Sequence, residues 1–412
     1  MPMLCKNEKL TSVNFARKKM FASVKKIKTE IVNILQSEGR ILAENIYSKI
    51  NIPEFDNSAV DGYAFKNDPS KFYKKFKIVG ESKPGYPFIK NINKNHAIKI
   101  FTGAYIIKKN NNLDTICMAE DCKVAGGVLE IKTKLRTGSN IRKKGEDVKK
   151  NKKIFSIGRK IRSVDLAQLS SLGIKRIKVF KKLKVGILSS GDELCEVKRF
   201  KKKFQIYDSN KLALIKLFQR IGCIVIDLGI TKDTTLDTEE KILKRICDLD
   251  LLVTSGGISK SETDKIGDFL QKKGKIFFWR LSIKPGRPFA FGKINNVPFI
   301  GLPGNPVATI ITFFMLVIKY VKKLSGCNEN ETIERILPSN FVMKKKKGRR
   351  EWIRGLIVRK KDKCTLEKFP TTGSGIISSI SQSQGIIEIE EKKEYVRKGT
   401  LLKFYRYEDM LN

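Results

Sequence analysis

The sequence predicts a multi-domain protein of mixed α/β and β structure, with a doubly wound, mostly parallel α/β domain at its centre. Apolar strands alternate with helices of roughly ten residues over residues 181–326, a pattern typical of a parallel sheet covered on both faces. Short strands separated by glycines fill residues 51–140, and residues 327–412 are again rich in strands. At roughly 100–200 residues per domain, the 412 residues suffice for about two to four domains.

The N-terminal region carries apolar side chains at helical spacing between basic ones. This pattern predicts a first helix from residue 13 and a second helix over residues 43–50, which Pro53 ends. One side of the first helix is expected to contain Phe15, Met20, Val24, Ile27, Ile31 and Ile34. Further on, strands are predicted at residues 76–79, 97–101, 115–119 and 128–131, and a helix at residues 163–172. We therefore expect residues 1–50 and 141–180 to form a discontinuous N-terminal domain, into which residues 51–140 are inserted as a β-rich domain.

The elements of the α/β domain are predicted from the spacing of its apolar residues, which alternates between short apolar runs typical of strands and the helical period. Its strands are expected at residues 183–189, 223–228, 251–254, 276–283, 289–291 and 297–300. Its helices are expected at residues 210–221, 236–246, 263–273 and 306–324. Residues 327–412 then form a small C-terminal β domain.

The charge and apolar content exclude some classes of function. The chain carries 84 Lys and Arg against 42 Asp and Glu, which gives a formal net charge of +42. A charge of this size could serve binding to nucleic acid or to an anionic membrane. The lysines are spread over the whole chain, however, and no RNP, zinc-finger or arginine-rich signature accompanies them. We expect no specific nucleic-acid partner, and the 41% apolar content excludes a wholly disordered chain.

Histidine and cysteine usage excludes several kinds of active site. His96 is the single histidine, which excludes a multi-His zinc site and argues against Ser-His-Asp or Cys-His catalysis. The eight cysteines form no CxxC pair, so we expect free buried thiols in a reducing compartment. The longest largely apolar run, residues 307–318, is shorter than the ~20 residues of a membrane-spanning helix. With no apolar secretory segment at the N-terminus, a soluble, cytoplasmic protein is expected.

Each strand of the α/β domain is followed by a glycine-containing loop, and ligands bind outside the carboxyl ends of strands in an open parallel sheet. Glycines let backbone N–H groups approach an anion, and Asn305 as the N-cap before Pro306 opens a helix with its positive end on the same side. The loops also carry the charged residues Asp192, Glu193, Asp233, Asp264, Lys284 and Arg287. Carboxylates suit Mg²⁺ and cations suit an anionic substrate. A phosphate-plus-metal site is predicted, although each carboxylate taken singly could be an ordinary cap or turn residue.

A second polar cluster lies outside this domain. Residues 56–64 hold Asp61 with a second aspartate, a serine and a glycine beside aromatic residues, and the loops containing Thr102, Glu120 and Asp147 carry further hydroxyl and carboxylate groups. Turns and Asx motifs explain each of these loops equally well when it is taken alone.

Seven motifs in a fixed order carry a resemblance to a known family. They lie at residues 56–64, 102–104, 140–147, 190–194, 255–264, 284–288 and 302–306. In this order they resemble the molybdopterin molybdenumtransferases, relatives of the gephyrin E domain and of the plant molybdenum-insertion enzyme. The resemblance covers about residues 10–410, and residues 349–355 and 373–375 resemble the C-terminal domain of that family.

The resemblance implies an L-shaped, four-domain protomer with a C-terminal β-barrel-like domain, assembled as a homodimer. It implies the final step of molybdenum cofactor biosynthesis, the Mg²⁺-dependent insertion of molybdate into adenylylated molybdopterin with release of AMP. The active cleft would lie between the molybdopterin-binding α/β domain of one subunit and the β-rich domain of the other. Implied protein partners are the molybdopterin adenylyltransferase and apo-molybdoenzymes.

The resemblance also implies roles for particular residues. Glu193, Asp233 and Asp264 would hold Mg²⁺ and the nucleotide phosphates, with Asp192 beside them. Lys284, Arg287, Arg354 and Ser374 would bind the molybdate oxyanion, since arginine forks and hydroxyl donors suit tetrahedral oxyanions. Asp61, Thr102, Glu120 and Asp147 would reach the cleft across the dimer, Asp61 and Asp147 as catalytic carboxylates. Further substrate contacts are expected from Ser190, Gly191, Ser255, Gly256, Gly257, Pro303, Gly304 and Asn305.

Other interpretations are left open by the sequence. A chain of this fold could act without turnover, as a molybdopterin-binding or scaffolding protein. The related adenylyltransferase of the preceding step resembles only residues 181–326, so the flanking domains argue against that activity. Tungstate and molybdate are nearly equal in size and charge, so the sequence does not choose between them. Residues 259–262 and Arg287 depart from the usual family pattern. These departures bear on the catalytic efficiency of the protein more than on its membership of the family.

Overall fold

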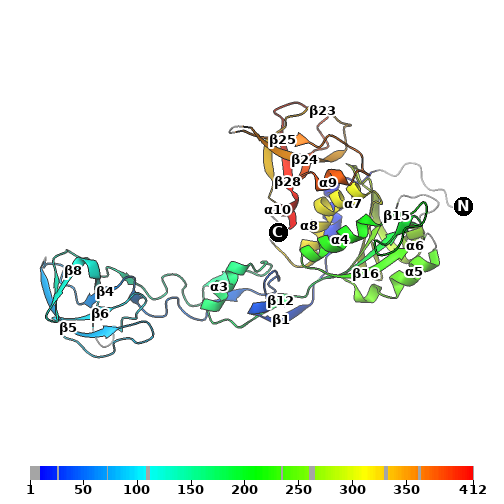
Figure 1. Ribbon diagram of the computed structural model, residues 1–412. Coiled ribbons are helices and arrows are strands. Elements are labelled where there is room, and N and C mark those ends of the chain that lie inside the picture. The colour runs from blue at the N-terminus through cyan, green and yellow to red at the C-terminus, as the bar shows by residue number, and fades with distance from the viewer. Residues whose placement is uncertain are drawn as a thin grey trace. The chain divides into compact units, whose positions relative to one another are not determined.

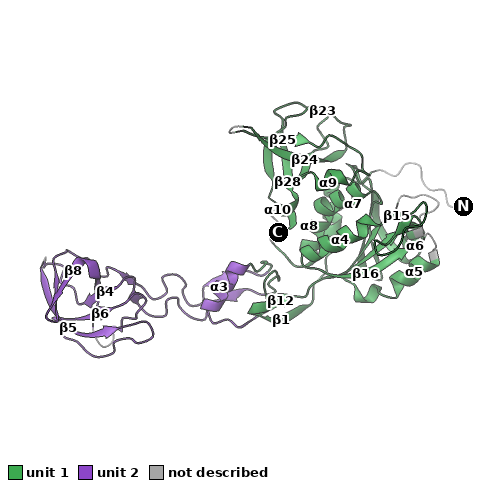
Figure 2. Ribbon diagram, viewed as in Figure 1, with its two compact units in different colours: residues 1–43, 158–162, 177–412 green, residues 44–157, 163–176 purple. Residues whose placement is uncertain are grey.

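The computed structural model describes residues 10–25, 27–71, 73–107, 112–232, 235–258, 265–328, 333–360 and 363–411. The chain divides into two compact units, coloured green and purple in Figure 2. The first unit contains residues 1–43, 158–162 and 177–412, and the second contains residues 44–157 and 163–176. Each unit has its own sheets and its own apolar core. The four domain boundaries expected from the sequence stay a prediction.

A six-stranded sheet forms the centre of the first unit, with the order β16-β13-β17-β21-β20-β18 (Figure 1). The strands are β13 Lys184–Ser190, β16 Ile224–Thr231, β17 Leu251–Ser255, β18 Gly274–Arg280, β20 Pro288–Ile294 and β21 Val297–Leu302. β16, β13, β17 and β21 run parallel, whereas β20 is antiparallel to both β21 and β18. β18 therefore points the same way as the parallel strands, and the loop after it lies at their carboxyl edge.

Helices cover both faces of this sheet. One face packs against α1 Val13–Ala22, α4 Ser209–Arg220, α7 Pro306–Thr312 and α8 Ile318–Leu324, and the other against α5 Thr235–Leu243 and α6 Lys265–Lys273. Strand β17 shows why both faces are apolar: Leu251 and Val253 belong to the first core and Leu252 to the second. All five residues of β17 are buried, as in other parallel sheets with helices on both sides. The predicted doubly wound, mostly parallel fold is confirmed.

The long C-terminal helix of this domain is interrupted by a π-helical turn. Residues Phe313–Val317 form this turn between α7 and α8, and all five side chains are buried. The guanidinium of Arg17 on α1 donates to the carbonyl oxygen of Met315 at 3.1 Å. A widened turn leaves backbone carbonyls without the usual helical partner, so the Arg17 contact satisfies one of them. The prediction of one helix over residues 306–324 is correct in extent but missed this turn.

The C-terminal part of the first unit is a second sheet, with the order β19-β24-β26-β28-β22 and β25 paired to β24. Its strands are β19 Ile283–Lys284, β22 Arg335–Pro338, β24 Arg350–Lys360, β25 Lys363–Lys368, β26 Gly385–Ile389 and β28 Leu401–Arg406. Smaller elements are β23 Met343–Lys344, β27 Tyr395–Val396, α9 Ser378–Ser381 and α10 Tyr407–Leu411. Strand β19 follows β18 in the α/β domain and pairs in parallel with the start of β24. This pairing fixes the C-terminal sheet beside the carboxyl edge of the α/β sheet.

The second unit is built on a six-stranded sheet with the order β7-β4-β6-β5-β9-β8. The strands are β4 Gly62–Phe65, β5 Lys74–Ser82, β6 His96–Ile100, β7 Thr115–Met118, β8 Cys122–Ala125 and β9 Val128–Ile131. The second unit also contains the short strands β2 Ile46–Tyr47, β3 Asn57–Ser58, β10 Ile141–Arg142 and β11 Lys153–Phe155. Its helices are the short helix η2 Ala119–Asp121 and α3 Ser163–Ser171. The strands predicted in this region and the helix predicted at residues 163–172 are confirmed.

The helix predicted over residues 43–50 is wrong. Residues Ile46–Tyr47 form strand β2, which pairs antiparallel with β11. The amide of Ser48 donates to the carbonyl oxygen of Lys152 at 2.9 Å, and the Asn45 side chain accepts from the amide of Ile157. Backbone groups that a helix would pair locally are thus paired with a distant segment of the chain, which no local pattern reveals.

The first helix is shorter than its apolar pattern suggested, and of the expected side chains within it only Met20 is buried. α1 ends at Ala22, where the Ser23 side chain donates to the carbonyl oxygen of Met20. Its buried face consists of Val13, Ala16 and Met20, whereas Phe15 is exposed. Of the later residues of the pattern, Ile31 lies in β1 Thr29–Asn33, which pairs with β12 Arg176–Phe180, and Ile34 begins the short helix η1 Ile34–Gln36. Val24 and Ile27 lie in the segment between α1 and β1. Further short elements are β14 Leu194–Cys195, β15 Ile206–Tyr207 and η3 Ile246–Asp248.

No disulfide joins the cysteines of the described residues. Burial is as expected for Cys117, Cys195, Cys223 and Cys327. It is wrong for Cys247 and Cys364, which are exposed because they lie on surface segments outside the cores. In the part of the chain that the structure describes, no helix is both long enough and apolar enough to cross a membrane.

Candidate active site

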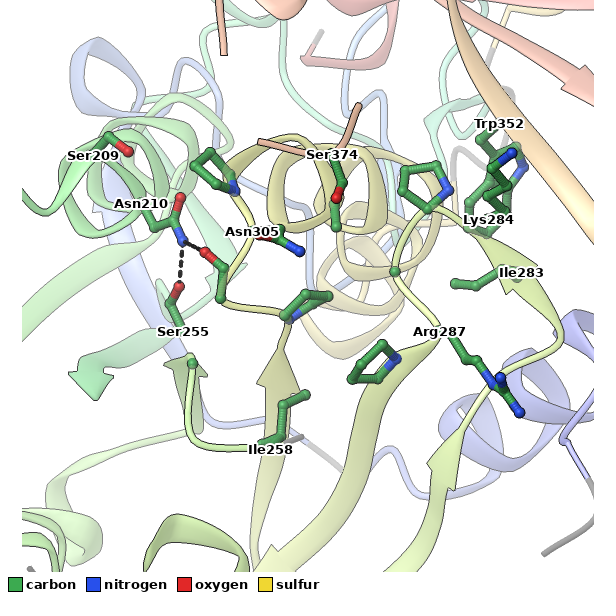
Figure 3. A pocket seen from close by; sticks show the side chains of 18 of the residues that line it. Ser209, Asn210, Ser255, Ile258, Ile283, Lys284, Arg287, Asn305, Trp352 and Ser374 are labelled. Atoms are coloured by element: carbon green, nitrogen blue, oxygen red, sulfur yellow. Dashed lines mark hydrogen bonds between the residues drawn. The ribbon is translucent and has the colours of Figure 1, made fainter. Parts of the chain in front are cut away.

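A cleft of about 740 Å³ lies at the carboxyl edge of the α/β sheet, within the first unit (Figure 3). Its walls come from the loops after β13, β17, β18 and β21, from the start of α4, and from β24 and the loop before α9. The predicted site residues that line it are Ser190, Gly191, Glu193, Ser255, Gly256, Gly257, Lys284, Arg287, Pro303, Gly304, Asn305, Arg354 and Ser374. Residues from two sheets that are far apart in sequence thus meet in one cavity.

The loops at the cleft floor approach one another backbone to backbone. Gly256 has a positive φ of +83°, and a Cβ added there would lie 2.5 Å from the carbonyl oxygen of Ser190. A Cβ added to Gly304 would lie 3.7 Å from the Cα of Gly256. Only glycine combines this φ with so close an approach. The loops after β13 and β17 therefore meet at a distance that a side chain at Gly256 would prevent, whereas a Cβ at Gly304 would make ordinary van der Waals contact with the loop after β17.

Asn210 joins two of these loops, although no motif in the sequence indicated that it belongs to the site. Its amide nitrogen donates to Ser255 Oγ at 2.9 Å and to the carbonyl oxygen of Gly304 at 2.7 Å (Figure 3). The side chain is held there because Asp208 caps α4 by accepting from the amide of Lys211 at 3.0 Å. In the sequence, the run Asp208-Ser209-Asn210 before an apolar helical pattern is typical of a helix start. Nothing in this run indicates the second contact that Asn210 makes with the loop after β21.

The N-terminus of α7 faces the cleft, as predicted, with Asn305 at the N-cap and Pro306 in the first turn. One of its amides is already used, because Val307 N donates to the carbonyl oxygen of Ser374 at 3.1 Å. This hydrogen bond fastens the loop before α9 to the helix end. The positive end of α7 thus attracts the C-terminal loop as well as any anion in the cleft.

Arg354 is nearly fully buried in the cleft wall, with 3% of its surface exposed. Its Nε donates to Ser379 Oγ at 3.0 Å, and its Nη2 donates to the carbonyl oxygens of Thr371 at 2.8 Å and Gly373 at 3.2 Å. Burial lowers the pKa of Arg354. The guanidinium therefore shapes the loop that carries Ser374, in addition to bringing positive charge to the cleft.

Lys284 and Arg287 add exposed cations on one side of the cleft (Figure 3), and the half-buried Arg349 lines the cleft as well. Lys284 ends β19 and Arg287 lies on the loop that follows it, and Figure 3 shows Lys284 beside Trp352 and across the cleft from Asn210 and Ser255. The side chain of Glu351, on β24, lies among these cations and is 2% exposed. The cleft thus has a cationic end and, opposite it, an end of hydroxyls, amides and glycines.

The structure describes only some of the predicted metal ligands. Glu193 lines the cleft, and its carboxylate folds back over Gly191, where an added Cβ would lie 2.5 Å from Glu193 Oε2. Asp192 is not among the described residues that line the cleft. Asp233 and Asp264 lie outside the described residues. Within the described ranges, no group of three or more His, Cys, Asp or Glu side chains is arranged to hold a metal.

The second predicted cluster belongs to the second unit. Both the amide and the hydroxyl of Thr102 donate to Asp61 Oδ1 at 2.7 Å, and these bonds, the amide first, lower the pKa of Asp61. The amide of Ala119 donates to the carbonyl oxygen of Asp61 at 3.1 Å, which places the short helix η2 with Glu120 beside it. Asp147 lies on another loop, where its amide donates to the carbonyl oxygen of Ile52 at 3.1 Å.

Family profiles match nearly the whole chain in three consecutive segments. The profile described as MoeA N-terminal region (domain I and II) matches residues 11–173. The profile described as Probable molybdopterin binding domain matches residues 186–323, and the MoeA C-terminal region (domain IV) matches residues 337–407. The cleft is lined by residues of the second and third segments.

Individual relatives agree with these profiles. A molybdopterin molybdenumtransferase from Haemophilus influenzae is 35% identical over 399 residues, which cover 95% of this chain and 97% of the relative. A molybdopterin molybdenumtransferase from Nostoc is 31% identical, over 72% of this chain and 70% of its own length. Among solved structures, the molybdopterin biosynthesis MoeA protein from Pyrococcus horikoshii superposes with a TM-score of 0.84 at 27% identity, over 97% of this chain and 100% of that one.

Proposed function

Since the chain belongs to the molybdopterin molybdenumtransferase family, a family of transferases in molybdenum cofactor biosynthesis, we propose that it inserts molybdate into adenylylated molybdopterin. In this proposal the reaction depends on Mg²⁺, releases AMP, and completes the cofactor. One observation carries it most directly: a single cleft joins glycine-rich strand-end loops with a cationic end that contains Lys284, Arg287 and Arg354. The first part suits a phosphoanhydride and the second a tetrahedral oxyanion.

The glycine-rich loops would hold the nucleotide phosphates. Glu193, with Asp233 and Asp264, would hold Mg²⁺, which would neutralise charge on the phosphoanhydride as it breaks. The hard oxygen donors of these side chains fit that ion, and the Glu193 carboxylate lies in the cleft wall. Ser190, Ser255 and Asn305 would orient the phosphates from the sheet edge.

The cationic end would bind molybdate. Lys284 and Arg287 reach it from the α/β domain, and Arg354 shapes the loop that presents Ser374. Fixed cations at this place stabilise an oxyanion without rearranging during the reaction. Molybdate and tungstate would compete there, because they have nearly the same size and charge.

We also propose that the protein works as a homodimer in the cytoplasm. Asp61, Thr102, Glu120 and Asp147 of the partner subunit would then complete the cleft, which supplies a role for the hydrogen-bonded Asp61–Thr102 pair. The adenylyltransferase that supplies the substrate and the apo-enzymes that receive the cofactor are the proposed protein partners.

AMP release tests the proposal. Purified protein is incubated with adenylylated molybdopterin and Mg²⁺, with and without molybdate, and AMP is measured by chromatography. Release that requires molybdate, with a product that activates a molybdenum apo-enzyme, is the expected result. Tight substrate binding without release would instead indicate a non-catalytic molybdopterin-binding or scaffolding protein.

A further inference from the structure

Glu351 is a buried carboxylate at the cationic end of the cleft. It lies on β24 directly opposite Lys284 in the parallel β19–β24 pair. Its Oε1 accepts a hydrogen bond from Arg349 Nη2 at 3.2 Å, and its Oε2 lies 4.0 Å from Lys284 Nζ. Among the described residues, Oε2 has no hydrogen-bond partner, although Glu351 is only 1% exposed.

A carboxylate removed from water is unfavourable unless cations and donors surround it. The cations around it include two that line the cleft: the Lys284 side chain is 48% exposed and that of Arg349 is 30% exposed. Buried Lys345 also interacts with it electrostatically. Arg349 donates to Glu351 through Nη2, and Lys284 Nζ lies at ion-pair distance from it. Glu351 therefore limits where both long side chains lie, at the side of the cavity where an oxyanion would bind.

Buried Arg349 Nε is likewise without a hydrogen-bond partner within the described residues. A guanidinium held on one side by a carboxylate and still partly exposed at the cleft is suited to contact a tetrahedral anion through its remaining N–H groups. Neither residue was among those expected from the sequence to bind substrate.

We propose that Arg349 is a further oxyanion-binding residue and that Glu351 is the positioning residue that holds Arg349 and Lys284 as a pair facing the cleft. This inference rests on the proposed function for the identity of the anion, molybdate. It adds to that function a specific arrangement: two cations fixed by one buried carboxylate on the strand pair that joins the α/β and C-terminal domains.

The Glu351→Gln variant distinguishes a positioning role from a simple charge effect, because the two predict opposite changes in the affinity for molybdate. Removing a negative charge close to an anion site would by itself strengthen anion binding. Losing the group that holds Lys284 and Arg349 would weaken it, since the cations must then be ordered by the ligand. For the full-length protein we expect the Kd for molybdate, measured by isothermal titration calorimetry, to rise by about tenfold.

Glu388→Gln is the matched control. Glu388 is a buried carboxylate of the same sheet that accepts from Trp352 Nε1 at 2.8 Å and lies 3.5 Å from Arg350, and it is not a lining residue of the cleft. We expect this variant to lower thermal stability without changing the Kd for molybdate. Glu351→Asp, which keeps the charge but shortens the side chain, should weaken molybdate binding, and Arg349→Gln should do so with AMP affinity unchanged.

The binding titration is independent of turnover, so its failure differs from failure of the proposed function. If the wild-type protein binds molybdate but does not release AMP with it, the proposed reaction is wrong while the variants still test the positioning of the cations. If Glu351→Gln binds molybdate as tightly as the wild type or more tightly, Glu351 does not position Lys284 and Arg349, and the inference is overturned. Absence of molybdate binding by the wild type would overturn it as well.

Discussion

At the cleft floor, the amide nitrogen of Asn210 donates to Ser255 Oγ and to the carbonyl oxygen of Gly304. These bonds hold the loops after β17 and β21 at a fixed separation, from a side chain that is itself fixed by the start of α4. If these loops hold the nucleotide phosphates as proposed, Asn210 would affect phosphate binding through the geometry of the loops.

Asn210→Asp tests this role with almost no change of shape. The substituted oxygen would face the carbonyl oxygen of Gly304, acceptor against acceptor, and we expect a loss of about 1–3 kcal/mol in the free energy of unfolding. We also expect AMP affinity to fall by about tenfold, because the loops lose their relative position. Calorimetric titration with AMP and thermal unfolding measure the two effects. Lower stability with unchanged AMP affinity would show that Asn210 is purely structural.

Asp61 gives a prediction about pH. Its pKa is lowered by the amide and then the hydroxyl of Thr102, so these bonds stabilise the folded protein above the ordinary aspartate pKa of about 3.9. That contribution is lost as pH falls through the lowered pKa of Asp61 and the carboxyl group becomes protonated.

Thr102→Val removes the hydroxyl and keeps the amide. We expect the pKa of Asp61, followed by NMR titration, to rise part of the way toward its usual value. The stability difference between the wild type and Thr102→Val should be largest near neutral pH and should vanish in acid. An unchanged pKa in the variant would show that the hydroxyl bond contributes nothing in solution.

At the scale of elements, the carboxyl edge of the α/β sheet depends on the turn after β17. Gly256 combines a φ of +83° with a Cβ position 2.5 Å from the carbonyl oxygen of Ser190. Gly229, in β16, has the same φ of +83° but nothing within 4 Å of its Cβ position. The two glycines separate backbone strain from close packing.

Gly229→Ala should cost about 1 kcal/mol of stability, since only the left-handed conformation is unfavourable for alanine. Gly256→Ala should cost clearly more, because the loop must also move away from Ser190, and it should weaken AMP binding. Chemical denaturation measures both costs. Equal losses in the two variants would mean that the loops at the cleft floor have room to separate.

Elements also show where local patterns fail. The strands and helices of the α/β domain follow from hydrophobic period because helices bury both faces of its sheet. Residues 43–50 were misjudged because their backbone partners lie about a hundred residues away, in β11 and its neighbours. The π-helical turn at Phe313–Val317 was also missed, since its partner Arg17 lies on a different helix.

At the scale of the whole molecule, the two polar clusters belong to different compact units. If the active form is the proposed homodimer with a shared cleft, Asp61→Ala and Glu193→Ala would each be inactive alone. A mixture of the two, after dissociation and reassociation, would contain hybrid dimers with one intact site. Random pairing then gives about a quarter of the wild-type AMP release.

A site formed within a single chain predicts a different result for the mixture. If both clusters of one chain served one site, no hybrid dimer would contain an intact site, and the mixture would stay inactive. A mixture of Glu193→Ala with a second variant of the same cleft, Lys284→Ala, is the control that should remain inactive in either case.

The sequence by itself determined the family, the doubly wound sheet and the residues at its carboxyl edge, because the alternation of strands and helices and the glycine-rich turns follow from local pattern and motif spacing. Tertiary structure alone decided which other side chains reach the cleft. Glu351 lies opposite Lys284 only because β19 pairs with β24. Asn210 reaches Gly304 only because α4 packs against one face of the sheet, beside α7. Contacts between segments so far apart in sequence depend on the packing of whole elements, which no local stretch of residues encodes.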